Sequence, residues 1–268
     1  MSLRPAAIVT GASSGIGAAS AIALARAGLD VVVDYRTGKT EAEAVAEQCR
    51  KAGAEAVAIA ADVADDEACC RLVSAALERF GRLDVLVNNA GMTRIVPAEP
   101  LESLDEPGFD RLFQVNVRSA FQMSRAAAKA LKERRGAIVN VSSHSGHSGF
   151  GSSLVYAATK GALNTLTLGL ARRLAPEIRV NAVCPGFVAT RWLQKAKGLS
   201  QTEFERFCDG VRRATPLDRL TGPGDVADAV VWLALRAPAI TGQLLVIDGG
   251  AHLAVMDPIR RLETPIED

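Results

Sequence analysis

Short hydrophobic runs alternate with longer helical segments along the whole chain. These runs are rich in β-branched residues and lack strict polar alternation, which is typical of strands buried on both faces. They lie at Ala6–Thr10, Val31–Tyr35, Ala56–Ala60, Val85–Asn88, Ala137–Ser142, Val180–Cys184 and Leu244–Ile247. Strands separated by helices imply right-handed crossovers. We therefore expect an α/β fold with one doubly wound, Rossmann-type parallel sheet flanked by helices.

The segments between these strands carry helix start and stop signals. Thr40 and Glu43 have the spacing of a capping box, and Asp65 or Asp66 can cap the helix that follows. The predicted helices are Gly15–Gly28, Thr40–Ala52, Asp65–Phe80, Gly108–Glu133, Ser153–Ala175 and Gly224–Leu235.

No Pro/Ser-rich linker, internal repeat or low-complexity tract divides the chain, so we expect one domain over residues 1–268. Two stretches interrupt the strand–helix alternation. Met92–Glu106 is polar and contains prolines, and Thr190–Thr215 is expected to form a helical lid. In open parallel sheets, ligands lie beyond the carboxyl ends of the strands, where such loops meet. The tail at 251–268 shows no obvious element.

Composition narrows the class of protein. Aromatic residues make up only 4% of the chain against 49% hydrophobic residues, so the core must consist mainly of Ala, Val, Leu and Ile. The net charge is +1, which predicts neither a nucleic-acid partner nor an anionic membrane surface. The five cysteines lack metal-ligand spacing and are typical of reduced thiols, so we expect a cytoplasmic protein without a structural metal. No apolar run reaches membrane-spanning length, and Ala6–Val9 already resembles a strand rather than part of a signal peptide.

A glycine-rich turn follows the first strand, at Thr10–Gly17. Its glycines permit a tight turn, and the helix that opens there directs backbone N–H groups and a positive dipole end at an anion such as a pyrophosphate. Asp62 ends the third strand, where it either meets an adenine amino group or is simply solvated. Asn88–Gly91 ends the fourth strand, where small residues either let a cofactor approach the backbone or form an ordinary turn.

Tyr156 and Lys160 lie one helical turn apart on the same predicted face. A cation about 4 Å from a phenol contributes about 4 kcal/mol in an effective dielectric of about 20. That is enough to lower a tyrosine pKa of about 10 toward working pH. Taken alone, such a pair is more often a half-buried aromatic beside a solvated cation.

The order and spacing of several motifs change that assessment, because together they resemble the short-chain dehydrogenase/reductase family from Ala6 to Gly250. The resemblance rests on Thr10-Gly11-x-x-x-Gly15-x-Gly17, Asp62, Asn88-Asn89-Ala90-Gly91, Asn116, Ser143, Tyr156-x-x-x-Lys160, Pro185-Gly186 and Asp248-Gly249-Gly250. It implies an oxidoreductase that interconverts a carbonyl and a secondary alcohol with NAD or NADP.

The resemblance also implies catalytic roles. Tyr156 would be the general acid in reduction and the base in oxidation. Lys160 would lower its pKa and hydrogen-bond the nicotinamide ribose. Ser143 would hold the substrate oxygen, with Ser142 as its immediate competitor. Asn116 would anchor a proton-relaying water, or else is an exposed mid-helix residue.

The resemblance further assigns residues to the cofactor. They are Gly11, Ser13, Ser14, Gly15, Ile16, Gly17, Tyr35, Arg36, Asp62, Val63, Asn89, Ala90, Gly91, Tyr156, Lys160, Pro185, Gly186, Val188 and Thr190.

The end of the second strand bears on which cofactor is used. Alignment of the valine run places Tyr35 at the strand tip, so that Arg36 can pair with a 2′-phosphate, assisted by Thr37 and Lys39. This favours NADP(H) over NAD(H). A shift of one residue would make Asp34 a ribose ligand and favour NAD. The glycine-rich turn lacks the basic residue that some NADP-dependent relatives carry.

Residues that would rim the substrate pocket are Arg94, Ser145, His147, Phe150, Phe187 and Trp192. His144 and His147 have no metal-ligand company, so each is more typical of a surface or hydrogen-bonded loop histidine. Lys132–Arg135 resembles the basic surface where carrier-protein reductases dock their partner, which keeps a 3-oxoacyl-thioester reductase open. Cations are also favourable at the end of any helix.

The expected function is therefore an NADP(H)-preferring carbonyl reductase acting on a small-molecule carbonyl or alcohol. An NAD-linked alcohol or polyol dehydrogenase is the first alternative. A catalytically silent dinucleotide-binding regulator is the second, although Tyr156 and Lys160, whose loss would mark it, are both present. The resemblance implies a homo-oligomer, tetramer or dimer, with no nucleic-acid or membrane partner and no metal.

Overall fold

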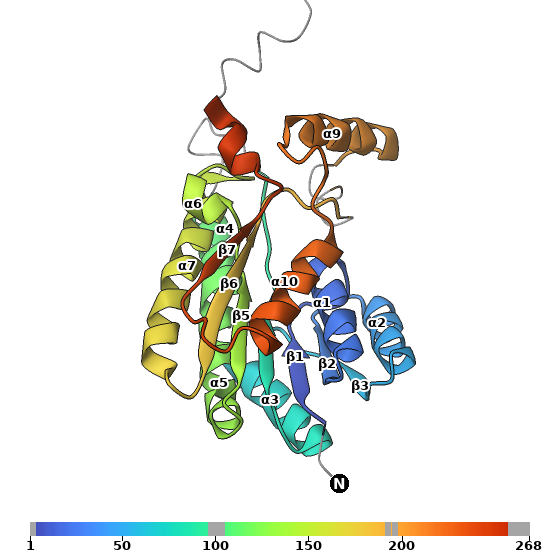
Figure 1. The fold of residues 1–268 in the computed structure, drawn as a ribbon, viewed down its shortest axis with the longest axis vertical. Coiled ribbons are helices and arrows are strands. Elements are labelled where there is room, and N and C mark those ends of the chain that lie inside the picture. Colours follow the sequence, from blue (N-terminus) through green and yellow to red (C-terminus); the bar gives the residue numbers. More distant parts are fainter. Residues whose placement is uncertain (1–3, 96–104, 191–193, 195–197, 257–268) are drawn as a thin grey trace, which may run out of the picture.

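One parallel sheet organises the protein in the computed structural model, which describes residues 4–95, 105–190, 194 and 198–256. Its strand order is β3-β2-β1-β4-β5-β6-β7 (Figure 1), and every neighbouring pair is parallel. The strands are β1 (Ala6–Val9), β2 (Asp30–Tyr35), β3 (Ala56–Ala60), β4 (Val85–Asn88), β5 (Ala137–Val141), β6 (Arg179–Pro185) and β7 (Leu244–Ile247). The predicted fold class and all seven predicted strands are confirmed, within two residues at their ends.

Helices connect successive strands. They are α1 (Gly15–Arg26), α2 (Lys39–Lys51), α3 (Asp66–Phe80), α4 (Glu106–Phe113), the π-helical turn η2 (Gln114–Arg118), α5 (Ser119–Glu133), α6 (Ser145–Ser148), α7 (Leu154–Leu174), α9 (Gln201–Ala214), α10 (Pro223–Leu235) and the 3-10 helix η3 (Ala251–Met256). Among the described residues, no helix combines the length and the apolar character that crossing a bilayer requires.

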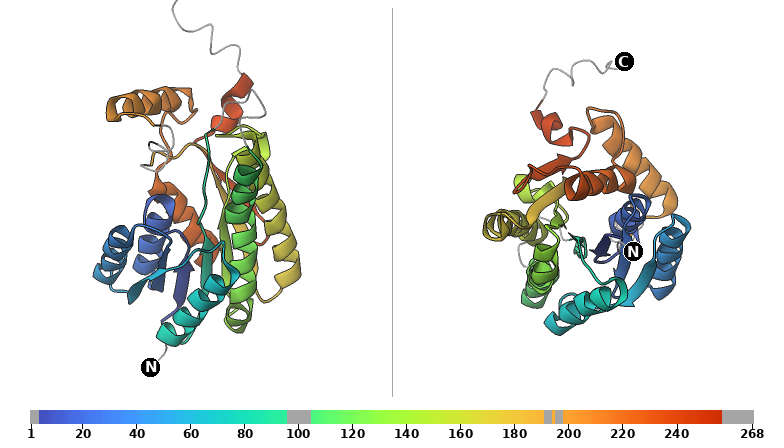
Figure 2. Two further views of the ribbon diagram at one scale, coloured as in Figure 1. Left: turned by 180° about the vertical axis from the view of Figure 1, so that it is seen from behind. Right: turned by 60° about the horizontal axis from the view of Figure 1, so that its bottom comes forward.

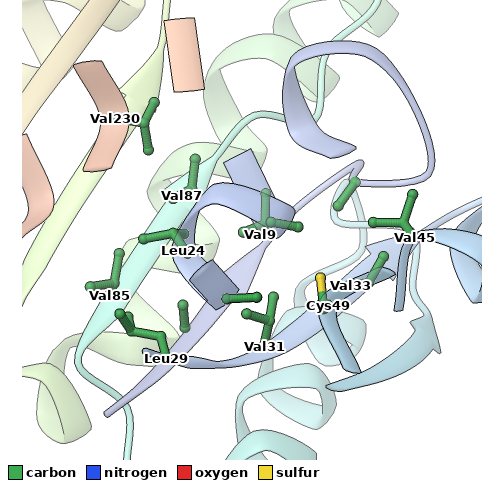
Figure 3. Packing of buried hydrophobic residues seen from close by; sticks show 14 of the residues in the cluster. Val9, Leu24, Leu29, Val31, Val33, Val45, Cys49, Val85, Val87 and Val230 are labelled. Carbon is green, nitrogen blue, oxygen red and sulfur yellow. The ribbon is translucent and has the colours of Figure 1, made fainter. Parts of the chain in front are cut away.

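The helices form two layers around the sheet. Helices α1, α2 and α10 pack on one face, and α3, α5 and α7 cover the other (Figures 1 and 2). Because side chains alternate along a strand, Ala7 and Val9 join the first layer while Ala6 and Ile8 join the second. The core on the side of α1, α2 and α10 consists mainly of valines and alanines packed around Leu24 (Figure 3). Each fully buried Val, Leu or Ile side chain contributes roughly 1.5–3 kcal/mol.

Two helix predictions need correction. Thr40 does not cap α2, because that helix begins at Lys39 after Gly38, which has a φ of 82°. Gly38 takes up the left-handed turn between β2 and α2 without a side-chain cap. The long helix predicted at Gly108–Glu133 begins earlier, at Glu106, and is interrupted by η2. Asp65 caps α3 as predicted, its carboxylate accepting a hydrogen bond from the N–H of Glu67.

The two edges of the sheet differ from its centre. Strands β1, β2, β4 and β5 are buried at every position, whereas each residue of β7 is partly exposed. Chain direction is the same in all strands, so the loops after their carboxyl ends meet at one edge. The order of the strands reverses between β1 and β4, which is where an open sheet of this kind forms a crevice.

Candidate active site

The glycine-rich turn after β1 is fixed to the end of β4 by a small hydrogen-bond network. The Asn89 side-chain amide donates to the backbone oxygens of Thr10 (2.8 Å) and Gly11 (3.0 Å). In return, the Thr10 hydroxyl accepts from the N–H groups of Asn89 and Ala90 at 2.9 and 3.0 Å. The predicted residue Asn89 therefore supports the turn directly.

The turn is packed too tightly for larger residues. A Cβ on Gly17 would lie 2.4 Å from the Asn89 side-chain nitrogen and 2.6 Å from the Gly11 oxygen. Gly11 has a φ of 60°, and a Cβ there would lie 2.9 Å from the Ala90 Cα. Ser14, which is exposed, stands at the N-cap of α1 without any side-chain hydrogen bond.

Asp34 lies beneath this turn and is only 1% exposed. One carboxylate oxygen accepts from the Gly11 N–H at 3.0 Å, and the other has no hydrogen-bond partner. Burial raises the pKa of Asp34 to about 7, and the nearby Asp62 carboxylate adds to the shift, while the Gly11 N–H opposes it. Asp34 therefore faces the turn, and Tyr35 ends β2 as the alignment predicts.

The outer side of the turn meets the residues assigned to the adenosine. Arg36 is exposed directly after β2, and Gly38 lies close to Ser13, its added Cβ 3.8 Å from that of Ser13. Asp62 accepts from the Ala64 N–H at 3.0 Å and from the Arg111 guanidinium at 3.1 Å. Burial acts to raise the pKa of Asp62, but these two donors outweigh it and hold the pKa below its usual value. A surface hollow of about 430 Å³ adjoins this pair, and the neighbouring Val63 is buried.

Helix α7 brings the catalytic candidates together at the end of β5. Ser153 caps α7 by accepting from the Tyr156 N–H at 3.1 Å, which fixes the first turn of the helix. The Ser143 hydroxyl lies close enough to the Tyr156 phenol to affect its pKa, and Lys160 lies one turn further, its Nζ 5.7 Å from the centre of the Tyr156 ring. Lys160 Nζ donates to the Val141 oxygen at 2.9 Å. Of the two competing serines, Ser142 points away and donates to Asn164 at 2.6 Å.

The pKa directions differ from the expected ones. Burial raises the pKa of the Tyr156 phenol, and the Ser143 hydrogen bond only partly offsets this. Burial also lowers the pKa of Lys160 to about 8. The expected lowering of the Tyr156 pKa by the Lys160 ammonium is therefore not found. The low dielectric that would strengthen the attraction also disfavours both charged forms.

Asn116 lies in the π-helical turn and is buried, not exposed. Its side chain accepts from the Met92 N–H at 2.8 Å and donates to the Met92 oxygen and the Thr159 hydroxyl at 3.0 Å each. A Cβ on Gly91 would lie 3.4 Å from the Asn116 oxygen and 3.9 Å from Lys160 Nζ. Asn116 thus links the loop after β4 to α7 beside Lys160.

The segment after β6 closes the opposite side. The Pro185 oxygen accepts from the His144 N–H at 2.9 Å, and the Gly186 N–H donates to the Ile247 oxygen at 3.0 Å. Val188 is buried and forms a bridge with Thr221. The Thr190 methyl would lie 3.6 Å from a Cβ added to Gly15, so this segment reaches the glycine-rich turn.

The substrate candidates are only partly brought together. Ser145 contacts the Ser143 hydroxyl at 3.2 Å, and Phe187 packs edge-on against Phe207 of α9 with ring centres 5.3 Å apart. Phe150 is 83% exposed, and Arg94 is exposed and pairs with Asp105 at 2.7 Å. His147 is exposed on α6, and Trp192 lies outside the described residues.

Two features of the site were missed in the sequence. Asp34 supports the turn, and His252 of η3 lies beside His144 and binds Asp248. The buried strand position of Asp34 was a usable signal, because an acid inside a hydrophobic run needs a partner. The proximity of His252 to His144 had no local signal, since the two residues are far apart in the chain.

These residues fit a dinucleotide. The fit rests on the crowded Gly11–Gly17 cradle, in which no added Cβ is tolerated at Gly11 or Gly17, and on a helix N-terminus without a side-chain cap. Both features suit the close approach of a pyrophosphate to the backbone. The hydroxyls of Ser143 and Tyr156 and the buried ammonium of Lys160 suit a nicotinamide and a carbonyl.

Known proteins resemble the chain over nearly its whole length. Residues 11–252 match a family model described as enoyl-(acyl carrier protein) reductase. An uncharacterized oxidoreductase of Methylorubrum extorquens is 44% identical over 92% of this chain and 97% of its own. A 3-oxoacyl-[acyl-carrier-protein] reductase of Staphylococcus aureus is 37% identical over 94% of this chain and 100% of its own. A crystal structure from Burkholderia xenovorans, assigned as a short-chain dehydrogenase/reductase, superposes with a TM-score of 0.87 at 39% identity, covering 94% of this chain and 100% of that one.

Replacing Gly17 by Ala is expected to weaken dinucleotide binding at least about tenfold, because the new Cβ displaces Asn89 and the turn it holds. Fluorescence titration with NADPH measures the change. Gly224→Ala is the matched control, since a Cβ there meets nothing within 4 Å. Equal affinity of Gly17→Ala and wild type would contradict a phosphate role for the turn.

Replacing Asp34 by Asn is expected to remove a pH dependence of stability. The pKa is raised to about 7 in the folded protein from 3.8, so folding takes up a proton between these values, and this contribution to stability is lost as pH rises. Between pH 4 and pH 8 the free energy of unfolding of the wild type should fall relative to Asp34→Asn by about 4 kcal/mol. Urea unfolding of both proteins across this range measures it, and parallel pH profiles would contradict the expectation.

Proposed function

This chain belongs to the short-chain dehydrogenase/reductase family, and we propose on that basis that it interconverts a carbonyl and a secondary alcohol using NADP(H) and Tyr156 as the acid–base. That it is an oxidoreductase acting on CH–OH groups follows from the family. The observation that carries the finer proposal is the meeting of Ser143, Tyr156 and buried Lys160 beside the glycine-rich turn.

A bound nicotinamide supplies or accepts the hydride. Negative charge then develops on the substrate oxygen, and the protein stabilises it with two hydroxyl donors. Ser143 holds that oxygen, and Tyr156 donates its phenolic proton to it in reduction or takes the proton back in oxidation. Both hydroxyls come from rigid positions, one at the end of β5 and one in the first turn of α7.

Lys160 assists from beneath. It is 5% exposed and anchored on the Val141 oxygen, so its ammonium has little freedom to move toward solvent. A tyrosinate formed when the proton leaves is stabilised by that ammonium, whose pKa of about 8 keeps it charged at neutral pH. The pair therefore acts on the transition state more than on the free phenol. Asn116 contributes by holding Met92 and Thr159 around Lys160.

The NADP(H) preference is supported by charge. Arg36 is an exposed cation after β2, close to where the turn holds the pyrophosphate, and Asp34, the only acid in β2 near the tip, is directed under the turn. An arginine there pairs with a 2′-phosphate in a charge-assisted contact.

The thioester alternative draws support from the Staphylococcus aureus relative, a 3-oxoacyl-[acyl-carrier-protein] reductase. In this chain Lys132, part of the basic segment at the end of α5, pairs with Glu177 at 2.9 Å. The expected lid at Thr190–Thr215 lies partly outside the described residues, and we propose a lid role only for its helix α9, supported by the Phe187–Phe207 contact.

We further propose a homo-oligomer, tetramer or dimer, which sedimentation velocity tests.

Replacing Tyr156 by Phe is expected to lower kcat at least about 100-fold with little change in cofactor affinity, because only the transferable proton is removed. NADPH absorbance with a panel of ketones, oxo esters and aldehydes measures turnover, and fluorescence titration measures binding. Tight cofactor binding without reduction of any carbonyl by the wild type would favour a silent regulator instead.

Replacing Arg36 by Ala is expected to raise KM for NADPH roughly tenfold or more and leave KM for NADH nearly unchanged, because only the 2′-phosphate loses its partner. Lys51→Ala, an exposed cation at the far end of α2, is the matched control. A wild-type preference for NADH in kcat/KM would replace the NADP(H) proposal with an NAD-linked dehydrogenase.

A further inference from the structure

Ser145 contacts the Ser143 hydroxyl twice, once through its backbone and once through its side chain. Its N–H donates to the Ser143 Oγ at 3.1 Å, and its own Oγ lies 3.2 Å from that atom. A third contact, from the Ser143 Oγ to the Pro185 oxygen, is longer at 3.5 Å. Ser145 therefore makes the two shorter of these contacts to the hydroxyl that holds the substrate oxygen in the proposed reaction.

These contacts leave the Ser143 proton available. A hydroxyl has one proton to donate and two lone pairs that accept, and the Ser145 N–H uses one of these lone pairs. The proton itself has two acceptors within reach, the Ser145 Oγ and the Pro185 oxygen. Both contacts are longer than the usual O–H···O distance of about 2.7–2.8 Å. Since neither acceptor holds the proton strongly, it can turn to a substrate oxygen.

The Ser145 hydroxyl serves Ser143 before and during that turn, because a hydroxyl rotates to accept or to donate. Before the reaction it accepts the Ser143 proton. Once that proton is directed at a substrate oxygen, the Ser145 hydroxyl can donate to the remaining lone pair of Ser143. Hydrogen bonds in a chain polarise one another, so a donor on the Ser143 oxygen makes Ser143 a stronger donor.

Close packing of α6 on α7 fixes where Ser145 stands. A Cβ on Gly146, the next residue, would lie 2.6 Å from the Lys160 carbonyl carbon and 2.8 Å from the Gly161 nitrogen. The two backbones are thus in direct contact at the turn of α7 that carries Lys160, with α6 at the upper end of α7 in Figure 1. Ser145 begins α6, so its position is set relative to the catalytic candidates.

Gly151 leaves room for the Ser145 hydroxyl beside the Tyr156 ring. A Cβ on Gly151 would lie 2.8 Å from the Ser145 Oγ and 3.5 Å from Cδ1 of Tyr156. One added carbon would therefore touch both side chains. Ser145 is thus a neighbour of the proposed general acid as well as of Ser143.

We propose that Ser145 is a positioning residue of the reaction, which orients the Ser143 hydroxyl with its N–H and its own hydroxyl so that the Ser143 proton is directed at the substrate oxygen. Ser145 acts through Ser143 and does not itself hold that oxygen. The inference rests on the proposed carbonyl–alcohol chemistry and adds to it a residue that shapes the donor pair.

Steady-state kinetics with NADPH and the best carbonyl of the panel test this role. Ser145→Ala is expected to lower kcat about fivefold to tenfold with KM nearly unchanged, because one hydrogen bond to the donor is lost. Ser145→Thr keeps the hydroxyl and should restore kcat to within about twofold of the wild type. Gly151→Ala keeps the hydroxyl but displaces it, and should lower kcat as Ser145→Ala does. Ser148→Ala is the matched control, since that exposed hydroxyl of α6 donates to the His144 oxygen at 3.3 Å.

The double variant Ser143→Ala/Ser145→Ala distinguishes positioning from a direct or structural role. Single-turnover reduction with excess enzyme records slow variants. It should show no further loss from Ser145→Ala once Ser143→Ala is present, because the group that Ser145 orients is gone. An additive loss in the double variant, or an unchanged kcat in Ser145→Ala, would overturn the inference.

Carbon-13 NMR of labelled tyrosine gives a readout that needs no turnover, because the chain has two tyrosines, Tyr35 and Tyr156. Burial raises the pKa of Tyr156 and Ser143 opposes this, so the phenol senses the Ser143 hydroxyl. Ser145→Ala should therefore move the Cζ signal of Tyr156 and leave that of Tyr35 in place. In the Ser143→Ala background it should move neither.

A Tyr156 signal that stays in place in Ser145→Ala would also overturn the inference. A protein that shows the coupling between Ser145, Ser143 and Tyr156 but reduces no carbonyl would retain the positioning and refute the proposed reaction.

Discussion

Buried hydrogen bonds hold α7 against β5, and this attachment determines where the Ser143 and Tyr156 hydroxyls stand. Lys160 Nζ reaches the Val141 oxygen, Ser142 donates to Asn164, and the Asn140 amide donates to Thr167 at 2.9 Å. All of these groups are nine-tenths or more buried, so each polar group would be costly without its partner. Ser143 follows the strand and Tyr156 opens the helix, so neither can shift unless this buried set is broken.

The same burial explains why the Tyr156 phenol holds its proton more firmly than a free tyrosine does. Removing the phenol and the ammonium from water disfavours a charge on either of them. The Tyr156 pKa is therefore raised, whereas an activated tyrosine has a lowered pKa. A site of this kind stabilises charge that appears during the reaction, because its dipoles are already fixed and no solvent needs to reorganise. The uncharged Tyr156 phenol and the fixed dipoles around it both follow from this low-dielectric environment.

How far the sequence predicted these features depends on the range of the interaction. Strands such as Val85–Asn88 were predictable because burial on both faces leaves an uninterrupted hydrophobic run. The glycine-rich turn and the spacing of Tyr156 and Lys160 are local, so their neighbourhood could be anticipated. The π-helical turn at Asn116 has no signal in hydrophobic periodicity, since one extra residue in a turn leaves the pattern nearly unchanged. Thr40 had a suitable capping spacing, yet the turn after β2 placed Gly38 at the helix start. The proximity of His252 to His144 depends on the whole sheet being assembled.

The end of β2 has a practical consequence for engineering. Asp34 points inward to the Gly11 N–H, while Arg36 is already outside the strand and exposed. Position 34 therefore maintains the glycine-rich turn, whereas position 36 lies outside the strand and is open to solvent. A mutant library that aims to change the coenzyme preference can vary positions 36 and 37, provided that Asp34 is kept to hold the turn.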